Sequence, residues 1–424
     1  MESTSAHTAR QDAAAPFGEV VGPLDCFTLE ELRTRTSVKW SFYPQDVLPA
    51  WVAEMDAATV PAVTEVVGQM LAAGDTGYPG AADPAVTVDL LAPVDYRNLP
   101  RYQDAYVDFA RRHWGVEVDP NAIALMPDVM QGIGHAVALL GLKRIAITTP
   151  VYPPFRAFPA ASGAQVIEAG MTREGRLDFA ELERVFKDAD GFLLCNPHNP
   201  SGVAHTREEL TRVFELANTH GIRVIVDEIH APLTSPAAEV ERGADPFTPT
   251  LSVPGSEGAI VLFSAAKGFN LAGFKSALMI GGADAAQFVA EIPELITHGA
   301  GTLSLAAHTA ALVYGDDWLE LVRADIDDRR SQLIEGLARL APEAWVQPAE
   351  ATYFAWVDFS RVPGPDGEPL GEDPGAFLLE HAKVAFNPGL SFGAGGEGFV
   401  RVNLATSREA IAEILRRIAA ALGR

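Results

Sequence analysis

Lys267 lies shortly past an apolar run, where a lysine can serve as a nucleophile. Residues 259–263 read Ala-Ile-Val-Leu-Phe, which predicts a buried strand, and small residues surround the lysine in Ser-Ala-Ala-Lys-Gly. Partial burial would lower the pKa of the ammonium group, so that the neutral amine can form an imine with a carbonyl compound. Most lysines are solvated surface residues, so this interpretation needs support from other residues.

Three further polar residues lie at or beside other apolar runs. Asp227 directly follows one such run, Asn196 begins the segment Asn-Pro-His-Asn-Pro-Ser-Gly after another, and Arg401 lies inside a third. Ligands of parallel sheets bind outside the carboxyl ends of the strands, so we expect these residues near Lys267. Each has a plainer explanation alone: Asp227 as a helix cap, Asn196 as part of a turn, and Arg401 as an exposed strand residue.

Strand and helix patterns alternate through the middle of the chain, which predicts a mostly parallel sheet covered by helices on both faces. The runs predicted as strands are 144–148, 165–168, 191–195, 222–226, 260–263 and 275–281, and helices such as 206–220 lie between them. Helical patterns over 24–35 and 306–339, strands at 353–358 and 399–404, and a final helix complete the pattern. We therefore expect an α/β protein with a second, smaller α+β unit.

The predicted domain boundaries follow these patterns. We expect a large domain over 57–300 and a small domain built from 24–56 together with 301–424. Residues 1–23 are interpreted as a disordered tail, and the Ala/Pro/Asp-rich stretch 81–100 as a surface excursion.

Composition excludes several functional classes. The 424 residues carry a formal net charge of −24, which argues against nucleic-acid binding because phosphates need a basic surface. No apolar run approaches membrane-spanning length, and the N-terminal residues lack a hydrophobic signal core. The only cysteines are Cys26 and Cys195, and we expect a buried free thiol at Cys195, no disulfide and a cytoplasmic protein. No metal site is predicted.

Taken together, the motifs around Lys267, Asp227, Asn196 and Arg401 resemble the pyridoxal 5'-phosphate (PLP) enzymes of the aspartate aminotransferase superfamily, fold type I. The resemblance covers roughly residues 24–424, except for 81–100. It implies the PLP-dependent transferase fold, whose sheet is of the seven-stranded type, with PLP bound by Lys267. Asp227 would then keep the pyridine nitrogen protonated, which makes the ring an electron sink.

The resemblance also implies the remaining ring contacts. Asn196 would hydrogen-bond the phenolic oxygen of the ring and lie beside the substrate. His230 would reach the same oxygen, at a position where aspartate aminotransferases usually carry tyrosine. Tyr152 would stack on the ring and take part in catalysis, since an aromatic side chain supplies a flat apolar wall.

The phosphate group needs backbone N–H groups and positive charge. A predicted helix begins at Val129 and Met130, and a helix N-terminus binds anions. Ser264 and Lys275 would complete this site. Tyr78 resembles the tyrosine that reaches the phosphate from the neighbouring subunit, which implies a homodimer with shared active sites.

On the substrate side of the site, the resemblance implies that Arg401 binds the α-carboxylate of a small amino acid bidentately. Tyr353 would line the same side, although core packing explains it equally well. The sequence Asp-Glu-Ile-His ending at His230 and the segment 51–56, Trp-Val-Ala-Glu-Met-Asp, resemble the carbon–sulfur lyase branch of the MalY/PatB type more than the transaminases.

The predicted reaction is therefore that of a cystathionine β-lyase or cysteine-S-conjugate β-lyase. Lys267 would take the Cα proton, a thiolate would leave from Cβ, and pyruvate and ammonia would follow. A class I/II aminotransferase shares every step up to the carbanion and remains the alternative. A binding or regulatory protein of the same fold with little turnover is the other class considered.

Overall fold

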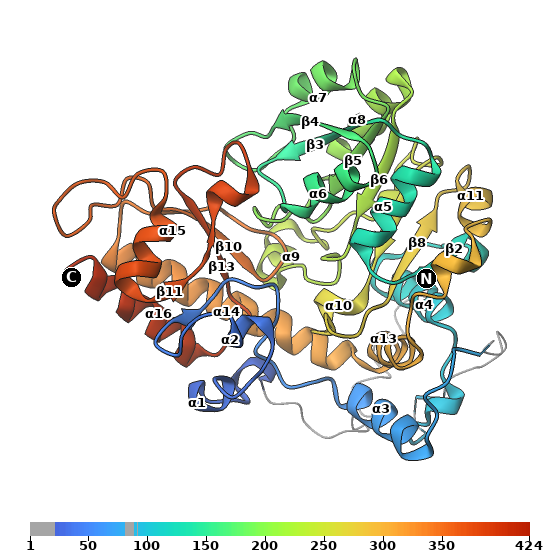
Figure 1. The fold of residues 1–424 in the computed structure, drawn as a ribbon, viewed down its shortest axis with the longest axis horizontal. Helices are drawn as coiled ribbons and strands as arrows, with labels where there is room; N and C mark the ends of the chain where they lie inside the picture. Colours follow the sequence, from blue (N-terminus) through green and yellow to red (C-terminus); the bar gives the residue numbers. More distant parts are fainter. Residues whose placement is uncertain (1–21, 81–88, 91) are drawn as a thin grey trace.

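The computed structural model describes residues 22–80, 89, 90 and 92–424 of the chain. A seven-stranded sheet with helices on both faces forms the larger part, and a four-stranded antiparallel sheet lies beside it (Figure 1). All but the last two residues of the predicted tail, and nine residues of the predicted excursion (81–88 and 91), lie outside the described residues.

The large sheet has the strand order β2-β8-β7-β6-β5-β3-β4. Its strands are β2 (Ile123–Met126), β3 (Arg144–Thr149), β4 (Gln165–Gly170), β5 (Gly191–Cys195), β6 (Arg223–Asp227), β7 (Ile260–Phe263) and β8 (Ala277–Gly281). Only β8 runs antiparallel to its neighbours, and the other pairs are parallel. The predicted mostly parallel sheet is confirmed, and its last strand begins two residues after Lys275.

Both faces of this sheet are apolar, because successive side chains of each strand enter different cores. Leu193 of β5 packs into the core that contains α5 (Val129–Leu139), whereas its neighbour Phe192 packs into the core that contains α8 (Arg207–His220). A sheet buried in this way needs strands with apolar interiors, as β5, β7 and the middle of β6 have.

The helices of this part lie before, between and after the strands in the chain. They are α3 (Pro61–Ala73), α4 (Tyr102–Trp114), α5, α6 (Pro154–Ala161), α7 (Phe179–Phe186), α8, α9 (Pro236–Arg242), α10 (Ala265–Gly268), α11 (Ala286–Ala290) and α12 (Glu294–Thr297). The predicted helical stretch 306–339 forms two helices, α13 (Thr302–Tyr314) and α14 (Asp316–Leu340), with Gly315 between them. A Cβ atom on Gly315 would lie 2.3 Å from the Ala311 carbonyl oxygen, so the junction requires glycine.

The smaller sheet has the order β12-β13-β10-β9 and is antiparallel. Its strands are β9 (Trp345–Val346), β10 (Phe354–Asp358), β12 (Asn387–Pro388) and β13 (Phe399–Asn403). Helices α15 (Pro374–Phe377) and α16 (Arg408–Ala421) lie on this side of the molecule (Figure 1). The N-terminal helices α1 (Leu29–Leu32) and α2 (Val38–Ser41) lie there too. The N-terminal segment joins it through a short parallel pair, β1 (Leu48–Pro49) with β11 (Val384–Ala385).

The predicted helix over 24–35 is wrong in extent. The segment forms a 3-10 turn, η1 (Pro23–Asp25), and the short helices α1 (Leu29–Leu32) and α2 (Val38–Ser41). The Thr28 side chain accepts from the Glu31 N–H while the Glu31 carboxylate accepts from the Thr28 N–H. This capping box ends any helix on its N-terminal side, because Thr28 must adopt an extended backbone.

The division into two domains stays a prediction. One separate core is formed by side chains from 32–50 and 333–422, in keeping with a small domain built from both ends of the chain. Residues 307–326, however, pack into the same core as α3 and α4. This packing favours a boundary within α14 over one at residue 300. None of the helices in the described part of the chain has the length and apolar character needed to cross a membrane.

A buried ion pair holds the N-terminal segment in place. The Lys39 Nζ atom lies 2.7 Å from Asp56 Oδ2, and both side chains are about 1% exposed. Trp40 Nε1 donates to the other oxygen of Asp56 at 2.7 Å. Asp56 therefore fixes the segment 51–56. This is the segment whose sequence resembles the carbon–sulfur lyase branch.

Replacing Asp56 with alanine is expected to lower the free energy of unfolding by about 3 kcal/mol, because the Lys39 ammonium is left buried without a carboxylate. Urea denaturation followed by circular dichroism measures the change. Asp46→Ala, at an exposed position, is the matched control and should change it by less than about 0.5 kcal/mol. Similar losses in the two variants would contradict the stabilising role of Asp56.

Candidate active site

A cavity of about 270 Å³ opens where the carboxyl ends of β5, β6 and β7 meet. Eight of the residues predicted for the site line it: Val129, Met130, Tyr152, Asp227, His230, Ser264, Lys267 and Lys275. They come from five separate stretches of sequence, and the parallel sheet brings them together at one edge.

Lys267 lies in α10, the single turn of helix that follows β7. Ser264 caps this turn: its Oγ accepts from the Ala266 N–H at 3.2 Å and donates to the Ser276 carbonyl at 2.6 Å. The Lys267 Nζ donates to the Ala53 carbonyl at 2.9 Å. Burial, and next the positive charge of Arg401, lower the pKa of Lys267 to about 8.

Asp227 is the last residue of β6, and its Oδ1 accepts from the Ile229 N–H at 3.0 Å. Burial raises the pKa of Asp227 to about 7, while this hydrogen bond and the charge of Lys267 act in the opposite direction. The buried free thiol of Cys195, predicted from the sequence, lies opposite Asp227 in the register of β5 with β6. A cation in the cavity would favour the charged form of this carboxyl group.

His230 and Tyr152 both line the cavity. His230 is buried, and its Nδ1 has no hydrogen-bond partner among the described residues. Burial holds the pKa of His230 well below its usual range, so the ring is neutral at physiological pH. The Tyr152 N–H donates to the Asn199 carbonyl at 3.1 Å, which ties its loop to the segment after β5.

The N-terminus of α5 supplies free N–H groups to the cavity. Val129 and Met130 are the first two residues of the helix, where N–H groups have no intrahelical acceptor. Asp128 caps the helix by accepting from the Gln131 N–H at 2.9 Å. Lys275 lies 3.6 Å from Asp128 and is 64% exposed, so its ammonium can turn towards an anion in the cavity.

Arg401 lies on β13, beside the cavity, and is 3% exposed. Its guanidinium is close to two aromatic rings, 4.0 Å from the centre of Phe354 and 5.2 Å from that of Phe392. Its hydrogen bonds go to Asn199 Oδ1 (2.9 Å), Asn387 Oδ1 (2.6 Å) and the Trp51 carbonyl (3.0 Å). These partners are neutral, and the Nε atom has none among the described residues. Burial lowers the pKa of Arg401 to about 10, so it stays charged at neutral pH.

The structure places Asn196 outside the cavity, which corrects the predicted position. Its Nδ2 donates to the Thr248 carbonyl at 3.2 Å, and its Oδ1 accepts from the His205 N–H at 3.1 Å. Asn199, three residues later in the same motif, lines the cavity and contacts Arg401. The motif contains two Asn-Pro pairs, and only the path of the loop decides which amide faces the cavity.

Tyr353 and Tyr78 do not line the cavity either. The Tyr353 hydroxyl donates to the Ala53 carbonyl at 3.0 Å, the same oxygen that Lys267 contacts. Sequence reasoning missed Ala53, although it lies in the stretch 51–56 that the resemblance singles out. Tyr78 is 98% exposed, so its predicted contact from a neighbouring subunit stays a prediction.

Residues 89–418 match the sequence profile of the family described as aminotransferase class I and II. The chain belongs to this family. A protein of Mycobacterium leprae (strain TN) named "Putative cystathionine beta-lyase" is 39% identical over an alignment of 421 residues that covers 94% of this chain and 98% of the relative. The cystathionine beta-lyase of Corynebacterium glutamicum is 31% identical over 398 residues, or 93% and 99% of the two chains.

A solved structure from Corynebacterium diphtheriae, described as a "putative plp-dependent beta-cystathionase", is similar with a TM-score of 0.82 and 31% identity. The similarity covers 95% of this chain and 99% of that chain. The predicted fold class of this aminotransferase class I and II protein is therefore confirmed.

In the protein without PLP, acylation of Lys267 by acetic anhydride is expected to show a midpoint near pH 8, because only the neutral amine reacts and its pKa is lowered to about 8. Mass spectrometry across a pH series measures the modified fraction, with exposed Lys187 as internal reference. Arg401→Met should move the midpoint to higher pH, since it removes a neighbouring positive charge. A midpoint in the ordinary range of solvated lysine would contradict the burial.

Asn199→Ala is expected to raise KM for the amino-acid substrate about tenfold, because it removes a hydrogen bond to a charged group. Asn196→Ala is expected instead to lower the free energy of unfolding by about 1–3 kcal/mol, because the buried His205 N–H loses its acceptor. Steady-state kinetics and urea denaturation of both variants measure the contrast. The reverse pattern would restore the original prediction for Asn196.

Proposed function

We propose that the protein is a PLP-dependent carbon–sulfur β-lyase of the cystathionine β-lyase type, which cleaves an L-amino acid to a thiol, pyruvate and ammonia. The observation that carries this proposal is the shared cavity of the Lys267 amine and the Asp227 carboxyl. The supporting relatives cover nearly the full chain and carry the name of this activity.

The donor set of the cavity fits PLP. The N–H groups at the start of α5, with Ser264 and Lys275, would hold the phosphate. Asp227 would pair with the pyridine nitrogen, and that positive partner would lower the raised pKa of the carboxyl. The unpartnered Nδ1 of His230 needs a polar group in the cavity, which the phenolic oxygen of PLP would supply.

We assign the face of the ring to Tyr152 and transfer the predicted contact of Asn196 with the phenolic oxygen to Asn199. Both residues line the cavity, and the N–H of the first donates to the carbonyl of the second. When bound, PLP supplies a carbonyl for the amine and an electron sink for the substrate. The remaining chemistry belongs to side chains of this chain.

Arg401 is assigned to the α-carboxylate of the substrate. Its guanidinium is buried, charged and surrounded by neutral partners, so an incoming carboxylate would supply the missing negative charge. The rings of Phe354 and Phe392 keep this contact dry and therefore strong. Tyr353 supports the same side through the Ala53 carbonyl.

Lys267 is assigned as the general base. Its pKa of about 8 places it near the working pH, where a base is most effective. The Cα proton moves to Nζ, the thiolate leaves from Cβ with the carbon–sulfur electron pair, and water completes the release of pyruvate and ammonia.

A class I/II aminotransferase is the alternative. The family profile carries that description, and more distant relatives are aminotransferases, such as LL-diaminopimelate aminotransferase 2 of Nostoc sp., which is 25% identical over 340 residues. Both reactions use the same base, carboxylate site and cofactor contacts, so the geometry of these residues supports either.

We also propose a cytoplasmic homodimer in which Tyr78 reaches the phosphate of the neighbouring subunit. Its side chain is 98% exposed in the single chain, which is unusual for a large aromatic residue. The free thiol of Cys195 favours a reducing compartment.

Purified protein with PLP and L-cystathionine is expected to release pyruvate and free thiol without any added 2-oxo acid. Lactate dehydrogenase coupling and a thiol reagent follow the two products, and a parallel reaction contains 2-oxoglutarate. Lys267→Ala is the control and should abolish both products. Glutamate formation that depends on 2-oxoglutarate, without thiol release, would make the protein an aminotransferase.

A further inference from the structure

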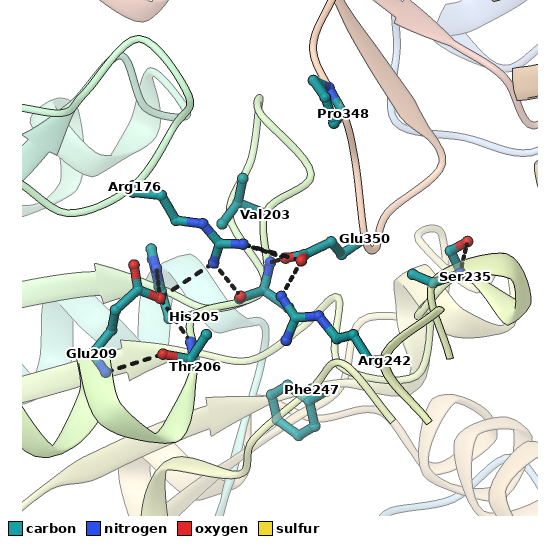
Figure 2. Close-up of polar contacts among 12 residues, drawn as sticks. Arg176, Val203, His205, Thr206, Glu209, Ser235, Arg242, Phe247, Pro348 and Glu350 are labelled. Atoms are coloured by element: carbon teal, nitrogen blue, oxygen red, sulfur yellow. Dashed lines mark hydrogen bonds and ion pairs between the residues drawn. The ribbon is translucent and has the colours of Figure 1, made fainter. Parts of the chain in front are cut away.

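Glu350 joins three separate segments of the chain through one carboxylate (Figure 2). Arg176 Nη2 donates to both of its oxygens at 3.0 Å, and the Ala204 N–H donates to Oε2 at 3.1 Å. Arg242 of α9 approaches Oε1 from the other side. The Glu350 side chain is only 18% exposed, so these contacts form in a largely dry environment.

The main chain at Glu350 also binds the loop that follows β5, which contains Gly202 and Ala204. The Gly202 carbonyl accepts from the N–H groups of both Glu350 and Ala351, each at 2.9 Å. Gly202 has a φ of +73°, and a Cβ atom there would lie 2.6 Å from the Cβ of Ala349. The loop after β5 and the segment before β10 are therefore in close contact, and no side chain would fit at Gly202.

This loop carries a residue of the active site. Asn199 lies three residues before Gly202, lines the cavity and accepts from Arg401 Nη1 at 2.9 Å. Glu350 thus fixes the loop at Gly202 and Ala204, just beyond the point where the loop faces the cavity.

Glu350 also lies close to the strand that carries Arg401. The chain enters β10 at Phe354, four residues later, and β10 pairs with β13 so that Trp356 lies opposite Arg401. One carboxylate therefore connects to both partners of the Asn199–Arg401 hydrogen bond, through the loop on one side and through the smaller sheet on the other.

We propose that Glu350 is a positioning residue that sets the Asn199 loop against the smaller sheet and so orients the Arg401 guanidinium for the substrate carboxylate. The proposal rests on the carboxylate role assigned to Arg401 above. Glu350 touches neither the cavity nor Arg401, so its effect on binding passes through Asn199 and β13.

The charges of the cluster suit this role. Arg176 also donates to Glu209 Oε2 at 3.2 Å and to the Ala204 carbonyl at 2.9 Å. Arg242 forms an ion pair with Glu350. Without Glu350, two arginines would face the Ala204 N–H with no acceptor between them. Repulsion between Arg176 and Arg242 would then loosen the loop after β5, which Arg176 contacts through the Ala204 carbonyl.

Binding of L-alanine to the PLP-loaded enzyme tests the proposal, because L-alanine has the α-carboxylate but no group that can leave from Cβ. Isothermal calorimetry is expected to give a Kd about tenfold higher for Glu350→Ala, since a small displacement of a binding group weakens its contact strongly. Glu350→Gln retains an acceptor for the Ala204 N–H, so its Kd should fall between those of the wild type and Glu350→Ala. With L-cystathionine, KM should rise for Glu350→Ala while kcat changes less than about threefold.

Glu209→Gln is the matched control, since it removes another carboxylate from Arg176 without touching Gly202 or Ala204, and its Kd should stay within about twofold of wild type. The PLP absorbance band should be unchanged in all three variants. An unchanged Kd for both Glu350 variants overturns the positioning role, whatever the cystathionine assay gives. An equal weakening in Glu209→Gln, or loss of the PLP band in Glu350→Gln, overturns it as well.

Discussion

Two cations that are largely removed from water, the part-buried Lys267 and the buried Arg401, impose the main constraint on this structure. Each is desolvated, and the charge of Arg401 contributes to the lowered pKa of Lys267. A buried charge is costly unless other groups compensate it. The surrounding carbonyls and amides of Ala53, Trp51 and Asn199 compensate only in part, so the site retains a demand for negative charge that a substrate carboxylate meets.

The fold satisfies this constraint by placing each cation on a different sheet. Lys267 follows β7 of the large sheet, whereas Arg401 lies on β13 of the small one. The 51–56 segment passes between them and offers its carbonyls to both. Its position depends in turn on the buried Lys39–Asp56 pair. Electrostatics at the site and packing of the N-terminal segment are therefore coupled.

The same separation explains why remote residues matter for substrate binding. Side chains on two sheets keep a common geometry only if the segments between the sheets are held firmly. Glu350 and Gly202 lie at such a junction, outside the cavity but next to the loop that carries Asn199. A lyase and an aminotransferase of this family would share this requirement, because both bind an amino-acid carboxylate.

The sequence by itself determined the alternation of strands and helices, the parallel sheet and the stretch around Lys267, because apolar periodicity and small flanking residues are local properties. It did not distinguish Asn196 from Asn199, which have the same local Asn-Pro context. Nor did it reveal the Ala53 carbonyl or the break at Gly315. These depend on which atoms meet across distant segments, and only the tertiary structure decides such contacts.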